Sequence, residues 1–572
     1  MGNFLGKNKK NIEKRPNIEK RPNMESFLII IGVCSFALMI SFICKVAMKE
    51  EIKNTEIVID LEKREYYEGK YDEAIEKLKK EGEKEKWPAN IIEESKIHSI
   101  KGDLLISNSF AEKAYIQSRV QLDVEGKNKY EKEMEALSKE IAFTYLVNGN
   151  VEKAIEYGEF FFEEFENDLL KETLVVAYLV NGDKIKAKNI LDSMKVDRKN
   201  SYRLSELGEM NILLKDYNEG IKYLKESYKL DKTNINVLNI LREYKDERDF
   251  IKYIKENEKD TMDNIFIAQI EIMNPETYDN GIKRMNNIEE GEFSRLILEL
   301  QASEKDLDEK RSEILINEIK ENFEDTYGGA YVLSGIYTKR DDLENAIHYA
   351  NKTLEINENF GKAYTLFSDI LKKETKDIDS AGTYIREGLL KSPYSIKIIK
   401  TAAEFYRDKG LNEISYIYYD IATKLDSYNY RNFVEKATIE SKGEEKKLPI
   451  ETIKNAIKID SENSELYNYL GIMYIEQGSL EYGIENIRKA YDVDNFNIKA
   501  LNNAAVYYTN YEKNISRAMS NIKTAKENIK EKTDIKIKES VSVNFSLIKK
   551  VYEEVEETSI QNWQIDNLEF LK

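Results

Sequence analysis

The chain has 572 residues, and its 88 Lys and Arg against 106 Asp and Glu give a formal net charge of −18. Hydrophobic residues make up 41%, enough for a folded core, and six prolines are too few for a Pro-rich linker or a collagen-like protein. Because an acidic chain lacks the basic surface that nucleic-acid phosphates require, we expect no nucleic-acid partner.

The longest apolar run lies near the beginning of the chain. Eighteen residues from Phe27 to Cys44 carry no charge, and the run continues past Lys45 to give the length of a membrane-spanning helix. We therefore predict a transmembrane helix at 27–48; a buried core helix and a cleaved signal peptide are the alternatives. Seven Lys and Arg precede this segment, so residues 1–26 are expected to be a disordered, basic cytoplasmic tail, with the rest of the chain outside the cell membrane.

After residue 50 the chain repeats a pattern of two short helices. Residues 144–150 and 177–183 share Tyr-Leu-Val-Asn-Gly, 33 positions apart, and a Gly between two amphipathic helices at this period is typical of helix–turn–helix repeats. The clearest unit, 464–497, carries Tyr467, Leu470, Gly471, Tyr474, Gly478, Ile484, Ile487 and Ala490 at repeat positions. The unit resembles the tetratricopeptide repeat (TPR) family, from which it departs at Gly483, where Ala is usual, and at Asn495, where Pro is usual.

The resemblance implies an all-α fold: a right-handed α-solenoid of stacked TPR-like repeats behind one N-terminal transmembrane helix. The expected N-terminal half of the solenoid is 49–234 and the C-terminal half is 327–540, with a capping helix at 541–572 that covers the last apolar stripe. The stretch 235–326 has poor repeat marks. It is either a set of degenerate helical repeats that continue the superhelix or a break between two halves.

In such a stack, the first helix of each unit lines the concave face. The positions expected to face the groove in three successive units are apolar: Phe143, Leu146, Val147, Val176, Leu179, Val180, Ile212 and Leu213. Since large exposed apolar patches tend to be interaction sites, we hypothesise that this apolar row binds an apolar or amphipathic segment of a partner protein. The alternative is tight superhelical packing of these side chains against the next first helix.

The corresponding positions of later units are basic. They carry Lys362, Lys372, Lys373, Lys397, Lys400 and Arg407. This basic row could hold an acidic partner segment or a phosphate-bearing polymer through charge-assisted contacts. The alternative is an ordinary solvated face paired with local Glu and Asp.

Residues able to carry catalysis or bind a metal are scarce. Both cysteines, Cys34 and Cys44, lie in the apolar run, and His98 and His348 are the only histidines. The chain has no Gly-rich phosphate loop and no HExxH motif. We therefore expect no enzymatic activity, no metal site and no cofactor.

Together these observations predict a membrane-tethered protein–protein interaction scaffold that docks partners on its concave face and contacts the bilayer through 27–48. The usage of Asn, Lys, Ile and Tyr suggests a bacterium, in which analogy with the family points to envelope or polysaccharide assembly. The alternative is a regulatory or receptor subunit that signals through its short cytoplasmic tail.

Overall fold

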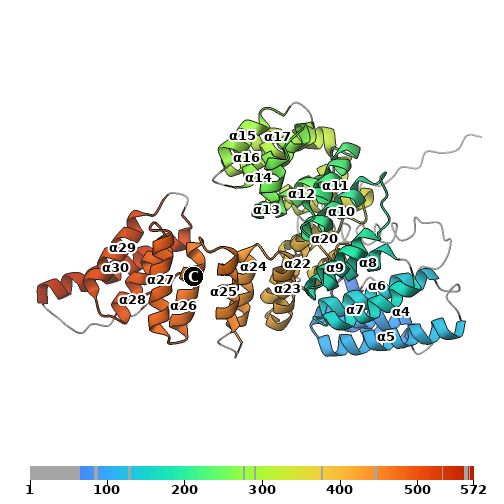
Figure 1. Ribbon diagram of the computed structural model, residues 1–572, viewed down its shortest axis with the longest axis horizontal. Helices are drawn as coiled ribbons and strands as arrows, with labels where there is room; N and C mark the ends of the chain where they lie inside the picture. Colours follow the sequence, from blue (N-terminus) through green and yellow to red (C-terminus); the bar gives the residue numbers. More distant parts are fainter. Residues whose placement is uncertain are drawn as a thin grey trace, which may run out of the picture. The chain divides into compact units, whose positions relative to one another are not determined.

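The computed structural model describes residues 65–82, 88–125, 131–165, 167–274, 277–288, 291–374, 378–443, 448–530, 533–558, 565 and 567–572. All regular secondary structure within these ranges is helical, which confirms the predicted all-α class (Figure 1). The helices are α3 (Tyr71–Gly82), α4 (Pro88–Lys101), α5 (Leu104–Glu125), α6 (Glu131–Val147), α7 (Val151–Glu164), α8 (Asp168–Val180), α9 (Lys184–Asp192), α10 (Ser201–Leu213), α11 (Tyr217–Leu230), α12 (Ile235–Glu243), α13 (Arg248–Glu256), α14 (Thr261–Met273), α15 (Tyr278–Met285), α16 (Glu292–Lys305), α17 (Glu309–Phe323), α18 (Tyr327–Lys339), α19 (Leu343–Ile356), α20 (Gly361–Glu374), α21 (Ile378–Lys391), α22 (Ile396–Asp408), α23 (Asn412–Leu425), α24 (Tyr430–Glu440), α25 (Leu448–Ile459), α26 (Ser464–Glu476), α27 (Leu480–Val493), α28 (Ile498–Asn510), α29 (Ile515–Glu527) and α30 (Ile535–Thr558).

Successive helices pack as pairs along most of the chain. Helix α6 packs on α7, α10 on α11, α18 on α19, α20 on α21, α26 on α27 and α28 on α29. The first helices of neighbouring pairs also contact each other, as in α4–α6–α8, α18–α20–α22 and α26–α28–α30. This is the stacking of helical pairs that a repeat with one apolar stripe per helix requires.

The turn between the two helices of a pair is set by local chemistry. Gly149 and Gly182 both adopt a left-handed backbone conformation, with φ of 80° and 86°. The amide of Gly149 donates to Leu146 O and that of Asn150 to Tyr145 O, which ends α6 in the manner of a glycine C-cap. The Asn150 side chain then accepts from the backbone N–H of Lys153 and caps α7. The glycine therefore ends one helix, and the Asn or Asp that follows it, Asn150 or Asp183, caps the next.

The departure of the 464–497 unit from the family pattern has a steric reason. A Cβ added at Gly483 would lie 2.4 Å from Ile475 Cγ1, and one added at Gly471 would lie 2.7 Å from Ile487 Cγ1. The helices α26 and α27 approach too closely here for Ala at either position. Two glycines facing each other permit this contact.

The stretch with poor repeat marks is helical throughout its described part. Helix α14 packs on α15 and α16 on α17, while α12, α14 and α16 contact one another as first helices do elsewhere. The helices α12 and α13 have 9 residues each and α15 has 8. Helices this short carry fewer periodic apolar positions, which explains the weak sequence signal.

The predicted placement in a membrane needs correction. None of the helices in the described ranges is long and apolar enough to cross a bilayer, and the two longest, α5 and α30, carry charged side chains along their length. The predicted span 27–48 and the tail 1–26 lie outside the described residues. The localisation as a single-pass membrane protein is therefore withdrawn.

Candidate partner-binding surfaces

All side chains of the predicted apolar row are buried. Phe143 and Val176 are 0% exposed, and Leu179, the most accessible of the row, is 8% exposed. Leu146 and Val147 on α6, Val180 on α8, and Ile212 and Leu213 on α10 belong to the same buried core. None of these residues presents a free apolar surface to solvent.

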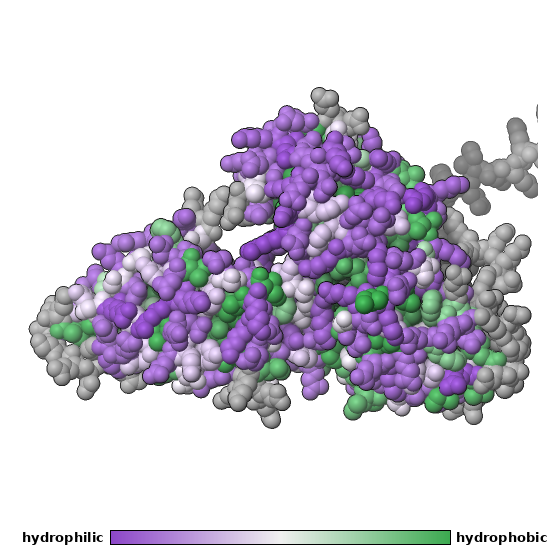
Figure 2. All heavy atoms as spheres, in the orientation of Figure 1, coloured by the Kyte–Doolittle hydropathy of each residue, from purple (hydrophilic) through white to green (hydrophobic). Residues whose placement is uncertain are grey.

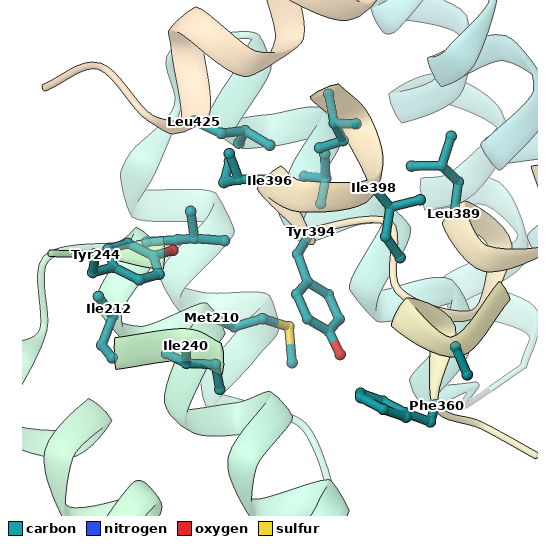
Figure 3. Close-up of a cluster of buried hydrophobic side chains, with 14 of the residues drawn as sticks. Met210, Ile212, Ile240, Tyr244, Phe360, Leu389, Tyr394, Ile396, Ile398 and Leu425 are labelled. Atoms are coloured by element: carbon teal, nitrogen blue, oxygen red, sulfur yellow. The ribbon is translucent and has the colours of Figure 1, made fainter. Parts of the chain in front are cut away.

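The helices α21 to α23 of the same chain cover this face. The guanidinium of Arg386 on α21 lies 5.2 Å from the ring centre of Phe143, and α8 packs directly on α23. Figure 3 shows Met210 of α10 facing the ring of Tyr394, which belongs to the link into α22, while Ile212 lies beside Tyr244. The concave side of α6, α8 and α10 is therefore filled by later repeats.

Lys362, the first residue of the basic row, takes part in this internal contact. It is 3% exposed, and its ammonium lies 3.0 Å from Glu243 and 3.4 Å from Glu209 and donates to Asn236 Oδ1 at 3.1 Å. Burial raises the pKa of the Glu209 carboxyl to about 8; Lys362 opposes the shift and Glu243 adds to it. The acidic partners of this lysine are thus residues of the chain itself.

Several of the remaining basic positions have partners within the chain. Lys373 donates to Thr338 O and pairs with Asp341, and Arg407 pairs with Glu435 at 2.9 Å. Lys372 is half-buried near the ring of Phe405, Lys400 is half-buried, and Lys397 is exposed.

A second buried cluster of charges joins α21 to the first repeats. The carboxyl of Glu387 lies 3.0 Å from Lys96 and accepts a hydrogen bond from the Tyr66 hydroxyl at 2.9 Å. Arg386 pairs with Glu140 at 3.1 Å, and Lys96 also lies 3.3 Å from Glu140. Burial alone would raise the pKa of Glu387, but Lys96 and Arg386 hold it at about 2. Charge complementarity as well as apolar packing therefore joins the two regions.

In this arrangement, the face predicted to receive a partner is occupied by the chain itself. The side chains of the apolar row contact later repeats, and the most buried lysine of the basic row contacts earlier ones. Partner binding by these two sets of residues stays a prediction.

A different concave surface holds an extended peptide. It is lined by α26, α28 and α30, which contact one another at one end of the array in Figure 1. The segment 567–572 lies against it, and Leu568, Phe570 and Leu571 pack as half-buried side chains on the core of these repeats. We call this surface the asparagine groove, after the four residues Asn468, Asn502, Asn503 and Asn544.

The four asparagine side chains hydrogen-bond to the backbone of alternate residues in the segment. Asn503 accepts from Leu571 N at 2.7 Å and donates to Leu571 O at 2.7 Å, and Asn468 donates to the same carbonyl at 2.9 Å. Two residues earlier, Asn544 accepts from Glu569 N at 3.1 Å and donates to Glu569 O at 2.9 Å. Asn502 donates to Glu569 O at 3.0 Å. This alternation is how the edge of a β-sheet holds an added strand.

Two polar contacts involve side chains of the segment. Ser540 on α30 donates to the Glu569 carboxylate at 2.9 Å, and the ammonium of Lys572 lies 2.7 Å from Glu476 at the end of α26. The contacts fix the direction of the segment in the groove, since reversing it would exchange an acidic and a basic side chain.

The asparagines have a clear physical role. All four are 0% exposed, and a buried amide costs free energy unless its donors and acceptor are paired. Within the groove, Asn503 also donates to Asn468 Oδ1 and Asn544 to Asn502 Oδ1, each at 2.8–2.9 Å. The bonds between asparagines hold the amides in place, and the peptide backbone satisfies their other groups.

This site is not among those predicted from the sequence, because the groove-facing positions were expected to act through apolar or charged side chains. Asn468 and Asn502 occupy the same place in two successive units, the fifth residue of 464–497 and of the unit that starts at Ile498. An asparagine that recurs at the same position of two successive first helices, among apolar residues, was the sequence pattern that could have indicated this site. Asn544 on α30 lies outside the repeat pattern and carried no such signal.

The described surface offers little else that suggests a site. The face in Figure 2 is mostly hydrophilic, with hydrophobic residues in small groups. Among the described residues, no group of three or more His, Cys, Asp or Glu side chains could hold a metal ion.

No protein-family model matches the chain, and no curated protein matches it. Among solved structures, yeast Tom70 is similar at 15% identity, with 87% of this chain and 98% of that chain covered and a TM-score of 0.34. A structure of the APC/C hetero-tetramer Cut9–Hcn1 matches at 12% identity over 79% of this chain and 95% of that chain, with a TM-score of 0.30. YrrB, described as a TPR protein with an unusual peptide-binding site, matches at 18% identity over 34% of this chain and 97% of that chain, with a TM-score of 0.26. The helical-pair fold of this chain therefore rests on its own helix contacts.

Proposed function

We propose that this protein is a protein–protein interaction scaffold that docks an extended polypeptide segment of a partner in the asparagine groove. The carrying observation is the set of hydrogen bonds from buried asparagines to the backbone of Glu569 and Leu571. If these helices bound no polypeptide backbone, apolar residues would be expected at the four asparagine positions, because a buried amide without hydrogen-bond partners costs free energy.

The groove recognises its occupant in two ways. Backbone contacts supply affinity for any extended segment, and neighbouring contacts supply selectivity. Leu568, Phe570 and Leu571 pack on the repeats, while Ser540 and Glu476 meet an acidic and a basic side chain. The favoured partner segment has apolar residues around one acidic residue, with a basic residue after them.

The test uses a variant that lacks residues 565–572 and a fluorescein-labelled peptide of the same sequence, Ile-Asp-Asn-Leu-Glu-Phe-Leu-Lys. Fluorescence anisotropy should show saturable binding, which Asn503→Ala weakens. A peptide N-methylated at the amides of Glu569 and Leu571 keeps every side chain but loses both donors, so it should bind much more weakly. Asn486→Ala is the matched control, because this half-buried asparagine lies outside the groove and donates to Tyr482 O of its own helix. Equal binding of both peptides would refute backbone recognition.

The more specific predictions are not carried forward. The role in envelope or polysaccharide assembly and the regulatory alternative both depended on the membrane placement, and residues 1–26 lie outside the described part of the chain.

A further inference from the structure

We infer that residues 567–572 act as a built-in competitor that closes the asparagine groove until a partner segment of the same chemistry displaces them. This inference rests on the proposed function and adds regulation to it. It starts from the fact that the groove in this structure already holds a peptide, and that the peptide belongs to the same chain.

The contacts of the segment with the groove resemble those of a bound peptide ligand. Its backbone bonds are made at Glu569 and Leu571, two residues apart, and it forms no helix of its own beyond α30. Leu568 and Phe570 are only half-buried, unlike the fully buried side chains of the repeats. An element that completes a core buries its apolar side chains fully, whereas this segment does so only in part.

The groove does not depend on the segment for its shape. Asn503 bonds to Asn468 and Asn544 bonds to Asn502 within the groove itself. Helix α28 packs directly on both α26 and α30. Release of the segment therefore exposes the peptide-facing donors and acceptors of four positioned amides, which an incoming extended segment can pair again.

The tether determines how strongly the segment competes. Residues 559–566 connect it to α30, so docking is intramolecular. A short tether gives an effective concentration on the order of 1 mM, so a probe with a dissociation constant of about 10 µM for the open groove binds the full chain roughly 100-fold more weakly. A partner must therefore bind more tightly than the segment or be presented at high local concentration.

The experiment compares the full chain with two variants, using the labelled 565–572 peptide as the probe. One variant lacks residues 565–572; the other, Phe570→Ser, keeps the chain length and leaves every groove residue in place. We expect the deletion to bind the probe about 100-fold more tightly than the full chain, with Phe570→Ser between them. Circular dichroism confirms that the variants keep their helical content.

Three outcomes separate the two proposals. Equal affinity of the full chain and the deletion would overturn self-competition while leaving groove binding intact. Absence of probe binding to a folded deletion variant and to Phe570→Ser would overturn the proposed function itself. Light scattering that shows the full chain to be a dimer, and the deletion a monomer, would place the segment in the groove of a second copy and overturn competition within one chain.

Discussion

Replacing Lys362 by Met tests whether the basic row faces solvent or the chain's own core. Lys362 is 3% exposed, and its ammonium contacts Glu243, Glu209 and Asn236 at 3.0–3.4 Å. Met fills a similar volume but leaves the mostly buried Glu243 carboxylate without its cation, whereas the Glu209 carboxyl, with its pKa raised to about 8, is largely protonated at neutral pH. Breaking a buried ion pair by removing one partner costs about 3–5 kcal/mol, so the free energy of unfolding should fall by about that amount.

The assay is urea denaturation followed by circular dichroism, with Lys373→Met as the control. Lys373 lies on the same helix, but its side chain is 41% exposed and its partner Asp341 is 77% exposed. Exposed pairs contribute about 0–1 kcal/mol, so the control should change little. Adding Glu243→Gln to Lys362→Met should recover part of the loss because it removes the carboxylate that has lost its cation.

Equal, small effects of Lys362→Met and Lys373→Met would refute this reasoning. That result would mean that Lys362 is solvated and free to meet an acidic partner. It would also mean that α20 does not pack on α10 and α12 in solution.

Three further predictions address other contacts. Arg386→Met removes one of the two cationic partners of Glu140 and should destabilise the contact of α21 with α6 by about 3 kcal/mol, seen as faster hydrogen exchange in both helices; unchanged exchange would contradict the buried pair. Gly471→Ala places a Cβ 2.7 Å from Ile487 Cγ1 and should cost about 1–3 kcal/mol by overpacking, measured as a lower melting temperature of the α26–α30 region; an unchanged melting temperature would argue against the close approach of α26 and α27. Burial raises the pKa of Asp426 to about 7 in the folded protein. The contribution of its protonated carboxyl to the free energy of unfolding is therefore fully present below about pH 4 and is lost as the pH rises through 7. The gain in unfolding free energy from Asp426→Asn should therefore grow by up to about 4 kcal/mol from pH 4 to pH 8, and a gain independent of pH would contradict the shifted pKa.

The sequence by itself determined the helices and their pairing. The Asn-Gly turns at 148–149 and 181–182 end one helix and allow the next to begin, and the apolar spacing of 464–497 places one stripe on each helix. These are local properties, because turn geometry and helix capping depend on residues a few positions apart. The repeat period could therefore be read without knowledge of the tertiary contacts.

Only the tertiary structure decided which faces are free. Phe143 meets Arg386 and Lys362 meets Glu209 across separations of more than 150 residues in the sequence. An apolar or charged stripe shows that a helix needs a cover, but the pattern is the same whether that cover is a partner or a later repeat. The docking of 567–572 on Asn503 and Asn544 has the same origin, because a buried amide requires a backbone partner without specifying which segment supplies it.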